Sequence, residues 1–142
     1  MDEKDIKIIS LLAKDSRKTL QEIANELSLS ISSVHKRVKK LEKDVIEKYT
    51  IIVNPEKFNQ ITAFLLISTS DQKRISEKLR EIPELLELYQ VFGNFNFIAK
   101  VRGSGIEKIS EISNSISALE GVNMVECIIA IRRIKEETWR PG

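Results

Sequence analysis

The densest positive charge in this sequence lies between His35 and Lys43. Five of those nine residues are basic and one is acidic, so the stretch carries a net charge of +4, against +2 for all 142 residues. Residues 61–142 are balanced, with 11 basic and 11 acidic side chains. Because positive charge concentrated on one element binds phosphate groups, this stretch is a candidate nucleic-acid contact.

Helical periodicity would place this charge on one face. At about 100° per residue, Val34, Val38 and Leu41 form an apolar stripe. The other sides carry the small, polar and basic residues, which are Ser32, Ser33, His35, Lys36, Lys39, Lys40 and Lys43. A helix with a packed back and a front that begins with short side chains is suited to the major groove of DNA.

We expect the early residues of this face to contact base edges and the later ones to contact phosphates. The first group is Ser32, Ser33, His35 and Lys36, and the second is Lys39, Lys40 and Lys43. Arg37 lies at the edge of the stripe, where it would either reach a phosphate or fix the helix through an acidic neighbour. The plain alternative is a solvated basic face, and for His35 a surface histidine. With one histidine and one cysteine, we expect no metal site.

The elements around the basic face can be read from their caps. Thr19 and Glu22 form a capping box, and Ser30 can cap the helix of the basic face. Periodicity and capping together predict three helices: residues 2–14, residues 20–27, and one that begins after Ser30. Two helices joined by a short turn after a leading helix predict a trihelical, winged helix-turn-helix.

The periodicity changes in the second half of the chain. An extended segment over residues 46–53 would act as a wing or a tether. Beyond it we expect strand 61–69, helix 71–82, strands 85–92 and 95–102, helix 104–119 and strand 122–134. This β-α-β-β-α-β order is ferredoxin-like. The predicted class is therefore α+β, with domains over residues 1–50 and 61–142 and a linker over residues 51–60.

The predicted sheet has two apolar faces. In strand 61–69, Ala63 and Leu65 share one face while Phe64 and Leu66 share the other. The two helices of this arrangement cover only one face, so the other needs a partner. A second copy of the chain is the simplest cover, which predicts a homodimer and a roughly palindromic DNA site.

Several protein classes are disfavoured by what the sequence lacks. No apolar run approaches the roughly 20 residues of a membrane span, and we expect a cytoplasmic location. Cys127 has no internal disulfide partner and is expected in the core. No phosphate loop, nucleophile elbow or metal cluster appears, so an enzyme is the least favoured class and no cofactor is expected.

The first half of the chain carries a specific pattern of residues. It includes Asp2, Asp5, Ile8, Ile9 and Leu12, the run Ala13-Lys14-Asp15-Ser16-Arg17, Ile23-Ala24, Leu29-Ser30, Val34, Arg37-Val38, Leu41-Glu42-Lys43, Val45-Ile46 and Tyr49. This pattern strongly resembles the Lrp/AsnC, or feast/famine, transcription regulators. The predicted second domain is similar to the sensor domain of that family, so the resemblance covers the whole chain.

The resemblance implies dimers that assemble into larger rings, double-stranded DNA as a partner, and a free amino acid as effector. The family holds its effector near a turn of the type Gly-x-Tyr/Phe-Asp, where this chain has Gly93, Asn94, Phe95 and Asn96. An amide at Asn96 can hydrogen-bond an ammonium group but cannot form an ion pair with it. A plain hairpin turn is the alternative. The chain also has Asp44, Val125 and Cys127 where the family usually has a glycine and two threonines.

Three functions stay open from the sequence. A sequence-specific regulator with an amino-acid effector is the expected one. An architectural protein that coats DNA without sensing anything would use the same basic helix. A helix-turn-helix used only for protein contact would show no salt-dependent affinity for DNA.

Overall fold

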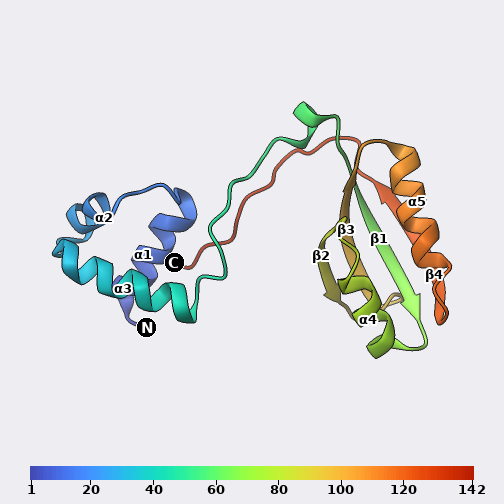
Figure 1. The fold of residues 1–142 in the computed structure, drawn as a ribbon, viewed down its shortest axis with the longest axis horizontal. Coiled ribbons are helices and arrows are strands. Elements are labelled where there is room, and N and C mark those ends of the chain that lie inside the picture. Colours follow the sequence, from blue (N-terminus) through green and yellow to red (C-terminus); the bar gives the residue numbers. More distant parts are fainter. The chain divides into compact units, whose positions relative to one another are not determined.

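The computed structural model describes residues 1–142, which form two compact units (Figure 1). The first unit contains residues 1–53 together with the C-terminal residues 135–142, and the second contains residues 54–134. The C-terminal segment joins the first unit by a hydrogen bond from Thr138 Oγ1 to the carbonyl of Ala13, 3.4 Å long. None of the helices combines the length and apolar character that crossing a bilayer requires.

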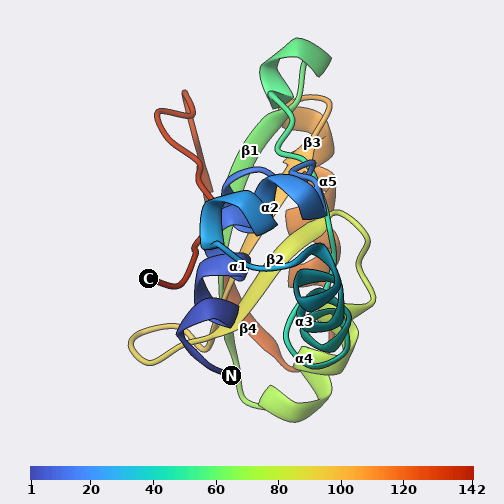
Figure 2. The same cartoon turned by 90° about the vertical axis from the view of Figure 1, so that its left-hand side faces the viewer.

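Three helices make up the first unit: α1 (Glu3–Lys14), α2 (Leu20–Leu27) and α3 (Ile31–Asp44) (Figure 2). Each begins where a local cap predicts it. Asp2 and Asp5 form a capping box on α1, Thr19 and Glu22 form one on α2, and Ser30 accepts the backbone N–H of Ser33 on α3. These caps satisfy backbone donors that the first helical turn leaves unpaired.

The turn between α2 and α3 is short and sharply bent. Ser28 adopts a left-handed conformation, with φ of 54°, and ends α2. The helices then pack around one apolar cluster made of Ile8, Ile23, Ala24, Val34, Val38 and Leu41. The apolar stripe predicted for the third helix is therefore buried in this cluster, and the opposite face of α3 is left to solvent.

The second unit is a four-stranded antiparallel sheet in the order β2-β3-β1-β4. Its elements are a 3-10 turn η1 (Pro55–Phe58), β1 (Ile61–Thr69), α4 (Gln72–Arg80), β2 (Leu85–Gln90), β3 (Phe97–Gly103), α5 (Ile106–Ser117) and β4 (Val122–Ile129). The β-α-β-β-α-β order is the ferredoxin-like arrangement that the periodicity predicted.

The two faces of this sheet have different surroundings. Ala63, Leu65 and Ile67 of β1 are fully buried, in one cluster with apolar side chains of α4 and α5. The other face carries half-buried or exposed apolar side chains, which are Phe64, Leu66, Ile98, Met124 and Ile128. We call this second face the open face. No helix of the unit covers it, as the alternation of β1 predicted.

Two expectations are wrong, and one of two alternatives is not met. Residues 46–53 contain no paired strand, because no ladder partner lies beside them, so this segment forms no wing and leads from the first unit to the second. The last strand ends at Ile129 rather than at residue 134, because Ile129 pairs with Ala63 near the start of β1 and little of the partner strand remains. Cys127 is exposed rather than in the core, since β4 is an edge strand.

Candidate nucleic-acid interface

The exposed face of α3 carries most of the residues predicted to contact DNA. Six of the eight are exposed, which are Ser32, His35, Lys36, Lys39, Lys40 and Lys43. Ser33 and Arg37 are half-buried beside them. The packed back of the helix is Val34, Val38 and Leu41, so burial and exposure alternate along α3 with the helical period. This face can offer short polar groups near its N-terminal end and ammonium groups along the rest.

The guanidinium of Arg37 forms ion pairs with two carboxylates at the start of α1. Its Nη1 donates to both carboxylate oxygens of Asp2, at 2.9 and 2.8 Å, and to Oδ1 of Asp5 at 2.8 Å. The hydrogen bond from Arg37, and then that from the backbone of Asp5, lowers the pKa of the Asp2 carboxyl from 3.8 to about 2. Of the two roles open for Arg37, the structure shows the contact with acidic neighbours.

Lys36 and Lys40 lie beside this ion pair without joining it. With Asp2, Asp5 and Arg37 they line a groove of about 760 Å³ between α1 and α3. Neither lysine takes part in an ion pair of its own within the structure, so both ammonium groups are available to a phosphate.

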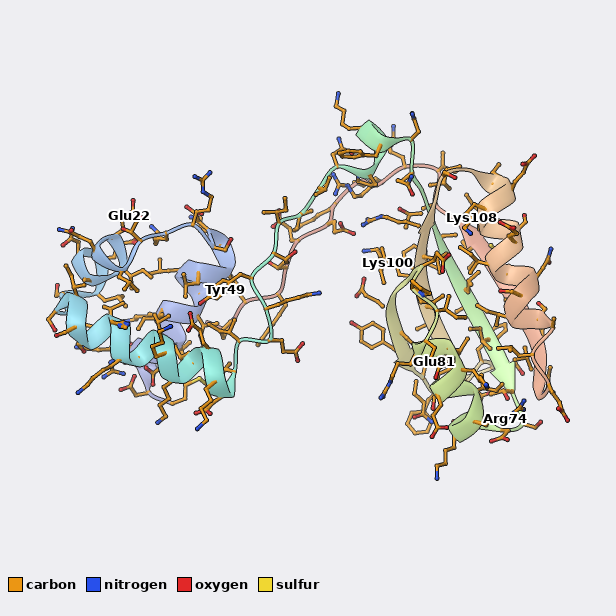
Figure 3. All side chains as sticks on the ribbon, in the orientation of Figure 1. Glu22, Tyr49, Arg74, Glu81, Lys100 and Lys108 are labelled. Carbon is orange, nitrogen blue, oxygen red and sulfur yellow. The ribbon has the colours of Figure 1, made fainter.

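The other flank of α3 is organised by Glu42. Its carboxylate pairs with Lys39 at 3.4 Å and accepts the hydroxyl of Tyr49 at 3.1 Å. Desolvation, and then the carboxylate of Glu42, raises the pKa of Tyr49. His35, Lys39, Glu42 and Tyr49 line a second groove of about 370 Å³, and Tyr49 is labelled where the chain leaves α3 (Figure 3). Glu42 and Tyr49 were not among the predicted site residues.

The predicted effector turn lies in the second unit, between β2 and β3. Gly93 has φ of 136°, a conformation that side-chain-bearing residues rarely adopt. Asn94 is exposed and Phe95 is half-buried. Asn96 holds the end of β1: its Oδ1 accepts the backbone N–H of Thr69 at 2.8 Å, and its own N–H donates to the carbonyl of Ile67 at 2.8 Å.

Thr69 is a structural residue that the sequence analysis missed. The residue is 7% exposed, and its Oγ1 donates to the carbonyl of Gly121 at 2.7 Å while accepting the N–H of Asp71 at 3.0 Å. The signal was present, because Thr69 is the one polar residue at the inward positions of β1. A buried hydroxyl of this kind nearly always has hydrogen-bond partners.

Both halves of the chain match known protein families. Residues 62–140 match the Lrp/AsnC ligand binding domain, and residues 1–44 match a winged helix-turn-helix DNA-binding domain. The chain belongs to the Lrp/AsnC family. It is therefore a DNA-binding transcription regulator with a ligand-binding domain, as the sequence pattern predicted.

The chain matches its relatives along nearly their whole length. The transcriptional regulator FL11 of Pyrococcus furiosus is 34% identical, with 99% of this chain and 96% of FL11 covered. The transcriptional regulator LrpA of Pyrococcus horikoshii is 36% identical, with 95% of this chain and 99% of LrpA covered. These relatives are transcription regulators by name.

Solved structures of Lrp/AsnC regulators have the same fold. The leucine response regulatory protein LrpA of Mycobacterium tuberculosis is 26% identical, with all of both chains covered and a TM-score of 0.87. A transcriptional regulator of Neisseria meningitidis, solved as a complex with L-methionine, is 25% identical over 99% of this chain and 96% of that one, with a TM-score of 0.87.

Proposed function

We propose that this Lrp/AsnC regulator is a homodimer that reads a roughly palindromic DNA site through α3 and responds to a free amino acid. The observation that carries the proposal is the exposed face of α3, where small polar and basic side chains lie opposite a buried apolar stripe. A cytoplasmic location is part of the proposal, because the partner is DNA. The proposal includes no enzymatic activity and no cofactor.

The roles of the α3 side chains follow from their order along the helix. Ser32, Ser33, His35 and Lys36 lie toward its N-terminal end and contact base edges in the major groove. Lys39, Lys40 and Lys43 lie further along and contact phosphates, which carry no sequence information but fix the register of the protein on DNA. Arg37 is left out of both groups because its guanidinium is held by Asp2 and Asp5.

The open face of the sheet supports the homodimer. Met124 is 53% and Ile128 is 48% exposed in the single chain, and both lie on this face. Phe64 and Leu66 lie between them and the neighbouring strand β3. Lys100 and Glu126 share this face, but exposed apolar side chains of this size are best covered when two copies pair by a two-fold axis. Such a dimer would present two α3 helices to two half-sites, and dimers could assemble further.

The turn at Gly93–Asn96 is the proposed effector site. The L-methionine in the Neisseria meningitidis regulator supports an amino acid as the class of effector. In this chain Oδ1 of Asn96 already accepts the N–H of Thr69. This oxygen is therefore already engaged and offers less to the ammonium group of an effector, and backbone N–H groups of the turn would hold the carboxylate.

The test combines DNA binding with an effector screen. The wild-type protein first selects a duplex from a random-sequence library, and its affinity is measured for that duplex and for a shuffled one across a range of salt concentrations. A thermal-shift screen against the twenty amino acids identifies any effector, because a ligand that binds the folded form raises Tm. We expect a preference for the selected duplex that the effector alters. Equal affinity for both duplexes and indifference to every amino acid would favour an architectural coating protein instead.

A further inference from the structure

Arg37 and the first turn of α1 form one connected set of hydrogen bonds. Besides accepting from Arg37, the two carboxylates cap α1: Asp2 Oδ1 accepts the N–H of Asp5 at 2.9 Å, and Asp5 Oδ2 accepts the N–H of Asp2 at 2.9 Å. Arg37 Nη1 reaches Asp2 Oδ1 and Oδ2 and Asp5 Oδ1. The same two side chains therefore begin α1 and hold the middle of α3. We call this set the Arg37 clamp.

The apolar cluster holds α3 against α1, and directional polar contacts add to what fixes the rotation and shift of α3. The cluster around Ile8, Val34 and Val38 sets the distance between the helices, but apolar contacts have no direction. Charge-assisted hydrogen bonds are directional, because they weaken steeply when donor and acceptor are misaligned. A shift of α3 along α1 would therefore misalign the hydrogen bonds of the clamp.

The clamp lies next to the residues proposed to contact DNA. Lys36 precedes Arg37, and Lys40 follows it by three positions, about one helical turn. The groove that holds the clamp is also lined by Lys36, Lys40 and Ser33. Any rotation of α3 that the clamp prevents would therefore displace these side chains first.

We propose that Arg37, Asp2 and Asp5 are positioning residues for DNA recognition: they hold α3 at the rotation in which its polar face matches the major groove, and Arg37 makes no phosphate contact. An ordinary surface ion pair contributes little. This one differs because the Asp5 side chain is only 15% exposed and the Arg37 side chain 29%, and because the two N–H groups of Nη1 bind both carboxylates, with one N–H shared between the oxygens of Asp2.

Asp5→Asn gives the sharpest test, since a purely electrostatic role and a positioning role of Asp5 predict opposite changes in DNA affinity. Removing a negative charge near DNA should strengthen binding if electrostatics alone matters. The clamp predicts weaker binding, by about fivefold for the selected duplex, with little change for the shuffled duplex. The matched control is Glu3→Gln, which removes the same charge from the same helical turn but breaks only the exposed pair with Lys7, 2.9 Å long. Stronger or unchanged binding of the selected duplex by Asp5→Asn overturns the proposal.

Arg37 variants separate positioning from phosphate contact. Arg37→Gln should weaken specific binding while leaving the slope of log affinity against log salt unchanged, whereas loss of a phosphate contact would lower that slope by roughly 0.9. Arg37→Lys should recover part of the affinity, because the lysine ammonium can reach one carboxylate. A lowered slope for Arg37→Gln overturns the proposal.

The double variant keeps the test valid if a single variant unfolds. Asp5→Asn combined with Arg37→Gln restores the net charge, and the Asp2 carboxylate that loses its partner is 55% exposed. If the two residues act through each other, the double variant loses no more specific affinity than either single variant. Losses that add would show two independent roles and contradict the clamp. Thermal unfolding of every variant confirms that DNA binding is measured on folded protein. Lys36 and Lys40 variants test DNA contact separately, so failure of the clamp leaves the proposed function standing.

Discussion

The side-chain oxygen of Asn96 accepts the backbone N–H of Thr69, 2.8 Å away and 27 residues earlier in the chain. Asn96→Ala would leave this partly buried N–H without its partner, so we expect the free energy of unfolding to fall by about 1 kcal/mol or somewhat more. Asn96→Asp keeps an acceptor at the same place and should cost much less. Urea unfolding of both variants measures the difference.

The control for this prediction lies two residues away. Asn94→Ala makes the same change in the same turn, but Asn94 is exposed and makes no hydrogen bond in the structure. It should leave the free energy of unfolding nearly unchanged. If Asn96→Asp destabilises the chain as much as Asn96→Ala, the hydrogen bond to Thr69 is not what Asn96 contributes.

Replacing Lys36 and Lys40 with alanine should weaken DNA binding and reduce its dependence on salt. Each phosphate contact that is lost lowers the slope of log affinity against log salt by roughly 0.9. Fluorescence anisotropy on the selected duplex at several salt concentrations measures that slope. Lys78→Ala is the control, because Lys78 is exposed on α4 in the other unit. An unchanged slope in the double variant would place the DNA contacts elsewhere.

A charge on the open face should separate the proposed dimer. In the dimer, Ile128→Asp would bury an unpaired carboxylate at a cost of several kcal/mol, enough to weaken association by about a hundredfold or more. Sedimentation equilibrium should then show wild-type protein as a dimer or larger and the variant near the 16.3 kDa of one chain. Ile106→Asp is the control: Ile106 is 59% exposed, but it begins α5 on the covered side of the sheet. Wild-type protein that sediments as a folded monomer would refute the dimer.

The Arg37 clamp should make the free energy of unfolding depend on pH in the acid range, below about pH 4. The hydrogen bond from Arg37 lowers the pKa of Asp2 from 3.8 to about 2. Between these values the unfolded chain binds more protons at this site, so the contribution of Asp2 to stability is complete above about pH 4 and is lost as the pH falls toward 2. Asp2→Asn should flatten the fall of unfolding free energy in that window. Parallel curves for the variant and the wild type would contradict this assignment.

The helices were predictable because their signals are local. The capping boxes at Asp2 and Thr19 and the cap at Ser30 involve residues three positions apart, and each helix begins where its cap predicts. The end of β4 was not predictable in this way. Residues 130–134 contain two isoleucines, but a strand needs a partner, and β1 begins only at Ile61. Residues 46–53, expected as a wing or a tether, form no paired strand for the same reason.

In the candidate site, too, features with a local sequence signal were predictable and contacts between distant residues were not. The exposed face of α3 follows from helical spacing, so its residues could be named from the sequence. The partners of Arg37 lie 35 and 32 residues away, and the partner of Asn96 lies 27 away. Only the packed fold brings such groups together, so the sequence left the role of Arg37 open and gave no partner for Asn96.

The pairing of Ala63 with Ile129 joins segments far apart in the sequence, so it bears on the order in which the two units fold during translation. During translation the three helices of the first unit emerge early, with every member of their apolar cluster between Ile8 and Leu41. The sheet of the second unit is complete only when β4, its fourth strand in chain order, has paired with β1. Pairings between segments so far apart in the sequence form slowly. We therefore expect the exposed face of α3 to form during synthesis, before the sheet that the proposed dimer uses is complete.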